Sequence, residues 1–120
     1  MTKKILIVDD EEDFLKAITI RLNHAGYDTS VAHDGVEAFS AIESDIPDLI
    51  ILDVQMPKMD GLQFIKQFRK NNKFKGIPII FLTAGAFDIA DEVETLSTAQ
   101  DFLLKSIDNE QIIDRVTKLL

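Results

Sequence analysis

Short apolar runs alternate along the chain with longer segments of mixed character, and this alternation is the main structural signal of the sequence. The runs are rich in β-branched residues and predict strands at residues 4–8, 27–32, 49–52, 77–82 and 102–104. Those at 49–52 and 77–82 are continuously apolar, which is typical of central strands covered on both faces. The run at 27–32 is more polar, so we expect it at an edge of the sheet.

The segments between the strands have the period of amphipathic helices. Their apolar side chains recur every three or four residues, in the sets Phe14, Ile18, Leu22; Leu62, Ile65, Phe68; and Ile112, Val116, Leu119. Gly26 is placed to end the first of these helices. Three helix starts resemble capping boxes, with an aspartate followed three residues later by glutamate or glutamine: Asp34 and Glu37, Asp60 and Gln63, Asp108 and Gln111.

Strand and helix therefore alternate five times, which predicts an α/β fold with a parallel sheet and helices on both faces. No change in composition marks a second domain, so we expect one domain over residues 1–120. In an open sheet of this kind, ligands bind beyond the carboxyl ends of the strands, where the strand order reverses. The residues that follow the strands are the candidates for chemistry: Asp9, Asp10, Asp53, Thr83 and Lys105.

Composition narrows the classes of function. The 120 residues, 46% of them apolar, suffice for one domain with a real core. The net charge of -8 opposes unaided binding to nucleic acid or to an anionic membrane, and a phosphate-bearing partner would need a cation between the two. The lack of cysteine excludes disulfides and thiolate metal sites. No apolar run suits a signal peptide or a membrane span, so we expect a soluble, cytoplasmic protein.

Some of the candidate residues also have an ordinary structural role open to them. Asp10 could cap the helix that follows it, where capping and the helix dipole each contribute roughly 0.3–1 kcal/mol. Thr83 alone is most often bonded to backbone, and Lys105 alone is most often a solvated loop lysine. Asp53 is harder to explain, because a carboxylate directly after a buried strand has little structural use. We expect only first-turn charges, without a catalytic role, from the remaining acidic residues Glu11, Glu12 and Asp13.

The carboxylates together suit a hard divalent cation. Mg²⁺ prefers oxygen ligands and near-octahedral geometry and keeps several waters, and Mn²⁺ accepts a similar ligand set. Asp10 and Asp53 could supply carboxylate ligands, with a backbone carbonyl near Gln55, and Asp9 could hold a metal-bound water. Such an ion would relieve the repulsion between the acidic side chains.

The same residues suit phosphoryl transfer. A carboxylate can attack phosphorus to give an acyl phosphate. Catalysis then consists mainly of positioning and of neutralising the charge on the transferred group. Lys105 and the cation would neutralise that charge, and Thr83 would donate a hydrogen bond.

The chain resembles the receiver domain of two-component response regulators over essentially its whole length. The marks are the acidic pair Asp9 and Asp10, Asp53 followed by VQMPKMDG, Thr83 with Ala84, and Phe102 with Lys105. The resemblance implies a flavodoxin-like (βα)5 fold with sheet order 2-1-3-4-5. It implies a signalling switch rather than a conventional enzyme, in which Asp53 accepts a phosphoryl group in an Mg²⁺-dependent reaction. The donor would be a phosphohistidine on a sensor histidine kinase or a histidine phosphotransfer protein. The domain would catalyse its own phosphorylation and the slow hydrolysis of the acyl phosphate.

The resemblance also implies roles for individual residues. Mg²⁺ would bind through Asp10 and Asp53, with Asp9 assisting. Thr83 and Phe102 would form the switch, in which the hydroxyl moves to the phosphoryl group and the ring turns into the space it leaves. Three positions would modulate hydrolysis or leave room for the phosphoryl group: Gln55, Ala84 and Gly85.

Output in this family usually passes through the face formed by the fourth helix, the fifth strand and the fifth helix. Through this face we expect a downstream protein or a second copy of the chain to bind, without direct contact with nucleic acid or membrane. We expect no output domain within residues 1–120.

The chain departs from the family pattern at two positions. Ser106 stands where the family usually has proline, and a cis bond to a non-proline residue costs about 3–4 kcal/mol, so we predict a trans bond. Thr98 stands where glycine often ends the fourth helix, so we expect a short, mobile helix over roughly 88–97. Phe87, just before it, could pack on the core or contact a partner.

Three other functions are compatible with parts of this pattern. A flavin-binding electron carrier shares the fold, but the carboxylates after the first strand would repel a flavin phosphate. A dedicated Mg²⁺ phosphohydrolase would need a separate general acid–base and a substrate pocket, and the sequence indicates neither. A degenerate receiver that signals without phosphate is opposed by the intact set Asp9, Asp10, Asp53, Thr83 and Lys105.

Overall fold

A single five-stranded parallel sheet forms the centre of the molecule. The computed structural model describes residues 2–54, 56, 59–83 and 99–120, and the strand order is β2-β1-β3-β4-β5. The strands are β1 (Lys4–Val8), β2 (Asp28–Ala32), β3 (Leu49–Asp53), β4 (Ile79–Thr83) and β5 (Asp101–Leu104). This order confirms the expected fold, with the polar strand β2 at an edge. β4 begins two residues later than predicted, directly after Pro78, which has no N–H to donate to the ladder.

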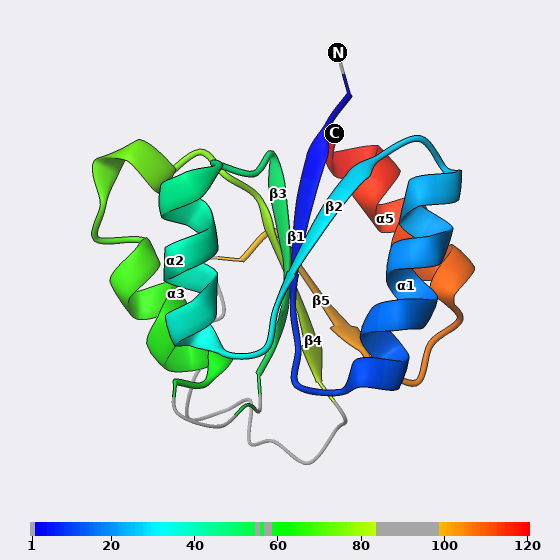
Figure 1. The fold of residues 1–120 in the computed structure, drawn as a ribbon, viewed down its shortest axis with the longest axis horizontal. Helices are drawn as coiled ribbons and strands as arrows, with labels where there is room; N and C mark the ends of the chain where they lie inside the picture. Colours follow the sequence, from blue (N-terminus) through cyan, green and yellow to red (C-terminus); the bar gives the residue numbers. More distant parts are fainter. Residues whose placement is uncertain (1, 55, 57–58, 84–98) are drawn as a thin grey trace.

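Helices cover both faces of the sheet (Figure 1). On one side lie α1 (Glu12–His24) and α5 (Asn109–Leu119), and on the other lie α2 (Gly35–Ser44) and α3 (Gly61–Phe68). A 3-10 turn, η1 (Asn72–Phe74), follows α3. The helix predicted over roughly 88–97, and Phe87 before it, lie outside the described residues. Within the described part of the chain, no helix has the length and apolar character needed to cross a bilayer.

Strand side chains alternate between the two faces, and each face has its own apolar cluster. On β1, Ile5 and Ile7 pack with the cluster under α1 and α5, whereas Leu6 and Val8 pack with the cluster under α2 and α3. All residues of β3 and β4 are buried, as expected of central strands. This frame fixes the backbone at the carboxyl ends of the strands, where the candidate residues lie.

Helix ends follow the sequence signals in part. Asp60 and Gln63 form the full capping box of α3, with both reciprocal hydrogen bonds. The side chain of Asp34 accepts from the backbone N–H of Glu37, but the reciprocal bond of a capping box is not formed. The side chain of Asp108 accepts from the N–H of Glu110 and not from that of Gln111, so this box is not formed either. Gly26 has φ of 100° just after α1, a conformation that side-chain-bearing residues rarely adopt.

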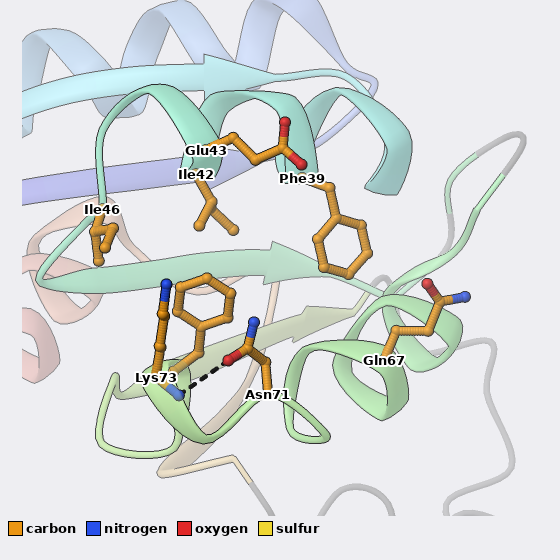
Figure 2. A pocket seen from close by; sticks show the side chains of 8 residues that line it. Phe39, Ile42, Glu43, Ile46, Gln67, Asn71 and Lys73 are labelled. Atoms are coloured by element: carbon orange, nitrogen blue, oxygen red, sulfur yellow. Dashed lines mark hydrogen bonds between the residues drawn. The ribbon is translucent and has the colours of Figure 1, made fainter.

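A hollow of about 460 Å³ opens between α2 and the segment from α3 to η1. Figure 2 shows Phe39, Ile42 and Ile46 entering it from one side, opposite Asn71 and Lys73. Two of its lining residues, Phe39 and Phe74, end a series of ring contacts, with centroids 4.7–5.3 Å apart, that runs through Phe64 and Phe68. None of the residues predicted to carry chemistry lines the hollow, so it is separate from the candidate site.

The start of α3 presses directly on the end of β3. The N–H of Gly61 donates to the carbonyl of Val54 at 2.9 Å. A Cβ at Gly61 would lie 2.3 Å from the backbone oxygen of Asp53, which is closer than atoms can approach. Glycine at this position therefore lets a helix start pack against the strand end that carries Asp53.

We predict that Gly61→Ala lowers the free energy of unfolding by about 1–3 kcal/mol, because the methyl group forces the backbone of β3 and α3 apart. Urea unfolding measures this change. The matched control is Gly76→Ala, where an added Cβ meets nothing within 4 Å. Equal stability of the two variants would contradict the close approach at Gly61.

Candidate functional site

Three carboxylates converge at the carboxyl edge of the sheet. Asp53 is the last residue of β3, and Asp9 directly follows β1, where its N–H donates to the carbonyl of Ala32 at 3.0 Å. Asp9 is 1% exposed and Asp53 is 5% exposed, while Asp10 faces solvent. Carboxylate oxygens of Asp9, Asp10 and Asp53 all lie within 4.8 Å of one another. The sheet therefore gathers, from separate strands, the three carboxylates that the sequence predicted as a group.

Lys105 brings one ammonium group to this cluster. It follows β5, and its N–H donates to the carbonyl of Thr83 at 2.7 Å. Its Nζ donates to Asp9 Oδ1 at 2.9 Å and to Glu11 Oε1 at 2.6 Å, and it lies 3.7 Å from Asp53 Oδ2. The side chain is 10% exposed, so Lys105 is not the solvated loop lysine that its position alone suggested. The described residues contain no cis peptide bond, so Ser106 follows a trans bond as predicted.

Burial governs the charges at the site. It raises the pKa of Asp9, although the hydrogen bond from Lys105 opposes this. Burial disfavours the ammonium of Lys105 as well, but hydrogen bonds to Asp9 and Glu11 outweigh it and raise the pKa of Lys105. The lysine therefore stays charged, yet it does not fully offset the burial of Asp9. A second cation would be favoured here.

A divalent cation fits the residues present. Asp9 Oδ2 is buried and accepts no hydrogen bond from any described residue, although Lys105 Nζ lies 2.7 Å from it. This buried oxygen can accept from more than one partner, so it can bind a divalent cation beside the ammonium of Lys105. With the exposed Asp10 and the buried Asp53, it offers the hard oxygen ligands that Mg²⁺ prefers. Gln55, whose backbone carbonyl was predicted as a further ligand, lies outside the described residues, as do Ala84 and Gly85.

Thr83 and Phe102 lie on the same face of the sheet. Thr83 ends β4 and is 2% exposed. Phe102 pairs with Phe81, two residues before Thr83, and strand partners point to the same side. The rings of Phe81 and Phe102 are 6.4 Å apart at 57°, and Phe102 is half-buried against the cluster under α2 and α3. Thr83 and Phe102 therefore lie on the same face of two neighbouring strands.

The start of α1 differs from the sequence-based expectation in two ways. Asp10 is not the N-cap: Glu11 takes that position, and Asp9 Oδ1 accepts its N–H at 2.9 Å. Asp9 directly follows β1 and lies two residues before Glu11, so its side chain can reach this N–H. The carboxylate of Glu11, expected to be an ordinary first-turn charge, contacts Lys105. The sequence carried no signal for this N-cap, since the usual preferences favour aspartate over glutamate at that position.

The first turns of α1 and α2 are joined through His33. Its ring nitrogens contact Glu37, at 2.9 Å, and Glu12. Hydrogen bonds to Glu37 and Glu12 raise the pKa of His33. Glu12 is therefore engaged with this histidine and not with Lys105.

The fold and the site together define a class of protein. The open parallel sheet, whose strand order reverses, is that of a doubly wound α/β protein. Its carboxyl edge carries an acidic cluster beside the ammonium of Lys105, so the site suits a cation and an anion side by side. The model of the response regulator receiver domain family matches residues 5–117. The chain therefore belongs to this family and is the receiver domain of a two-component response regulator.

Relatives and solved structures agree with this assignment. The chain is 38% identical to the alkaline phosphatase synthesis transcriptional regulatory protein PhoP of Bacillus subtilis, and 38% identical to the response regulator MprA of Mycobacterium bovis. These alignments span all of this chain but 49% and 51% of the two relatives, so the chain spans about half of their length.

Solved structures match the chain over nearly its full length. The chemotaxis response regulator CheY4 of Vibrio cholerae is 30% identical, with a TM-score of 0.90 and complete coverage of both chains. The response regulator TrrA of Thermotoga maritima, solved in complex with Mg²⁺-BeF, is 33% identical. Its TM-score is 0.86, and the match covers 99% of this chain and 100% of that one.

We predict that Mg²⁺ raises the melting temperature, because an ion that binds the folded state stabilises it, by about 1.4 kcal/mol at ten times its Kd. Asp10→Ala should remove this gain. Differential scanning calorimetry with and without Mg²⁺ measures it. Glu12→Ala, which removes a neighbouring charge outside the cluster, should keep most of the gain; its loss in both variants would argue against a defined ion site.

Proposed function

We propose that this receiver domain is a phosphorylation-dependent switch that accepts a phosphoryl group on Asp53. The observation that carries the proposal is the setting of Asp53. It is a buried carboxylate at the end of a central strand, with two further carboxylates within 4.8 Å and an ammonium 3.7 Å from its Oδ2. Such a group can act as a nucleophile where cations offset the charge of the incoming anion.

In the forward step, a carboxylate oxygen of Asp53 attacks the phosphorus of a phosphohistidine. The new P–O bond forms as the P–N bond breaks, and the imidazole leaves with the electron pair and takes up a proton. Lys105 donates to an oxygen of the transferred group and offsets its charge. Asp9, Asp10 and Asp53 would hold Mg²⁺ or Mn²⁺, with the backbone carbonyl of Gln55, and the ion would supply further neutralisation of the phosphoryl oxygens.

The return step is hydrolysis of the acyl phosphate. Water attacks the phosphorus, inorganic phosphate leaves, and the Asp53 carboxylate is restored. The domain thus catalyses its own phosphorylation and dephosphorylation and is not a conventional enzyme with a separate substrate. Gln55, Ala84 and Gly85 are proposed to set the rate of water attack or the space around the phosphoryl group.

The switch is proposed to run through Thr83 and Phe102. Once Asp53 carries a phosphoryl group, the Thr83 hydroxyl donates to one of its oxygens and vacates space at the end of β4. The ring of Phe102, half-buried on the same face, turns into that space. A local change in charge thereby becomes a change in packing at the edge strand β5.

The proposed partners follow from this chemistry. The phosphoryl donor is a sensor histidine kinase or a histidine phosphotransfer protein in the cytoplasm. The output partner is a downstream protein or a second copy of the chain, which binds the face formed by the helix predicted at 88–97, β5 and α5. The residues 1–120 are proposed to act as one receiver domain, which contacts neither nucleic acid nor membrane itself.

Incubation with acetyl phosphate and Mg²⁺ should add one phosphate to the protein, detected by intact mass. Asp53→Asn should abolish the adduct, because the nucleophilic oxygen is lost, and a chelator should prevent it in the wild type. Asp45→Asn is the matched control, since Asp45 is exposed and pairs with Lys4 instead. A folded wild-type protein that forms no adduct with any small donor would refute the phosphoacceptor role.

Thr83→Ala should separate phosphorylation from the conformational change. We expect Asp53 still to accept phosphate. The NMR signals of the Phe102 ring should shift on phosphorylation in the wild type and stay nearly unchanged in the variant. The reason is that no hydroxyl is left to move to the phosphoryl group, so phosphorylation no longer changes the space beside the ring. Equal ring shifts in wild type and variant would contradict the coupling.

A further inference from the structure

Glu11 is the N-cap of α1, but its side chain does not cap the helix. As the N-cap of α1 it would normally bond a free N–H of the first turn, yet its side chain makes no capping hydrogen bond. Asp9 Oδ1 holds the backbone N–H of Glu11 at 2.9 Å, which fixes the residue beside the acidic cluster. The side chain of Glu11 instead reaches Lys105, whose Nζ donates to it at 2.6 Å.

The contacts of Lys105 are unevenly shared between the carboxylates. Its ammonium has three N–H donors. It donates to Asp9 and to Glu11, whereas Asp53 Oδ2, at 3.7 Å, is beyond hydrogen-bond distance of Nζ. The ring of Phe14, from the first turn of α1, lies with its centroid 4.9 Å from Nζ. Lys105 therefore donates its hydrogen bonds on the side of α1, while its ion pair with Asp53 stays longer than a hydrogen bond.

We propose that Glu11 is a positioning residue that competes with an anion on Asp53 for the ammonium of Lys105. The inference rests on the proposed function, because the anion concerned is the phosphoryl group. For Lys105 to donate to that group, Nζ must move toward Asp53, and its hydrogen bond to Glu11 opposes this movement. Glu11 thus lowers the affinity of the site for a phosphoryl-like anion and favours the unphosphorylated state.

The exposure of Glu11 limits the size of the effect. The Glu11 side chain is 63% exposed, whereas that of Lys105 is 10% exposed. Water and salt therefore screen one end of the pair, and the competition amounts to about a two- to fivefold change in anion affinity, typical of exposed ion pairs. Such a change tunes the switch without disabling it.

The test is an NMR titration of the full chain with beryllium fluoride, a stable stand-in for the phosphoryl group, in the presence of Mg²⁺. Glu11→Gln keeps the shape of the side chain and removes its charge, and we expect its Kd for beryllium fluoride to fall about two- to fivefold. Glu12→Gln is the matched control, because it removes the same charge one residue away but contacts His33. Its Kd should stay at the wild-type value.

Three results of this titration would overturn the competition, and each has a distinct meaning. Equal gains in Glu11→Gln and Glu12→Gln would mean a general relief of negative charge and no specific role for Glu11. Wild-type binding with no gain in Glu11→Gln would overturn the competition while leaving the proposed function standing. Failure of the folded wild type to bind beryllium fluoride would instead overturn the proposed function, and the competition with it.

A crystal structure of Glu11→Gln without the anion gives a readout independent of binding. We expect Lys105 Nζ to approach Asp53 Oδ2 from 3.7 Å to hydrogen-bond distance, because the competing carboxylate is gone. An unchanged separation would overturn the proposal. The rise in melting temperature with Mg²⁺ reports that the variant is folded and that its acidic cluster is intact.

Discussion

Repulsion between carboxylates at one edge of the sheet is the constraint on which the rest of the site depends. Asp9, Asp10 and Asp53 have oxygens within 4.8 Å of one another, and each charged pair at such a distance costs about 3–4 kcal/mol at an effective dielectric of about 20. Two of the three are buried, and burial raises the pKa of Asp9 further. The fold keeps them together because β1 and β3 anchor their backbones in the two apolar clusters.

Neighbours on both faces of the sheet surround this strained group. On the side of α1, Lys105 is held by Asp9 and Glu11 beside the ring of Phe14. On the side of α2 and α3, Thr83 and Phe102 share a face with a tilted ring contact to Phe81. The carboxyl edge of the sheet therefore has charged groups on the side of α1 and packed side chains on the side of α2 and α3, and the proposed switch would use both.

Membership of the receiver family concerns the chain as a whole, whereas the proposed competition at Glu11 concerns one residue beside the site. The acidic cluster of Asp9, Asp10 and Asp53 comes from residues at the strand ends. Glu11, the N-cap of α1, is a carboxylate that stands nearer to Lys105 than Asp53 does. Under the proposed function, a substitution at Glu11 would shift the balance between the unphosphorylated and phosphorylated states without altering the fold, because Glu11 lies outside the apolar clusters.

The sequence by itself determined the alternation of strands and helices, the polar edge strand, and the residues that end the strands. It could do so because apolar periodicity and strand-end positions are local properties of the chain. The capping box at Asp60 was equally legible, since its two residues are close in sequence. Only the tertiary structure decided the N-cap of α1 and the contact between Glu11 and Lys105. Those depend on where Asp9 and Lys105, 96 residues apart, meet in space, and no local pattern encodes that distance.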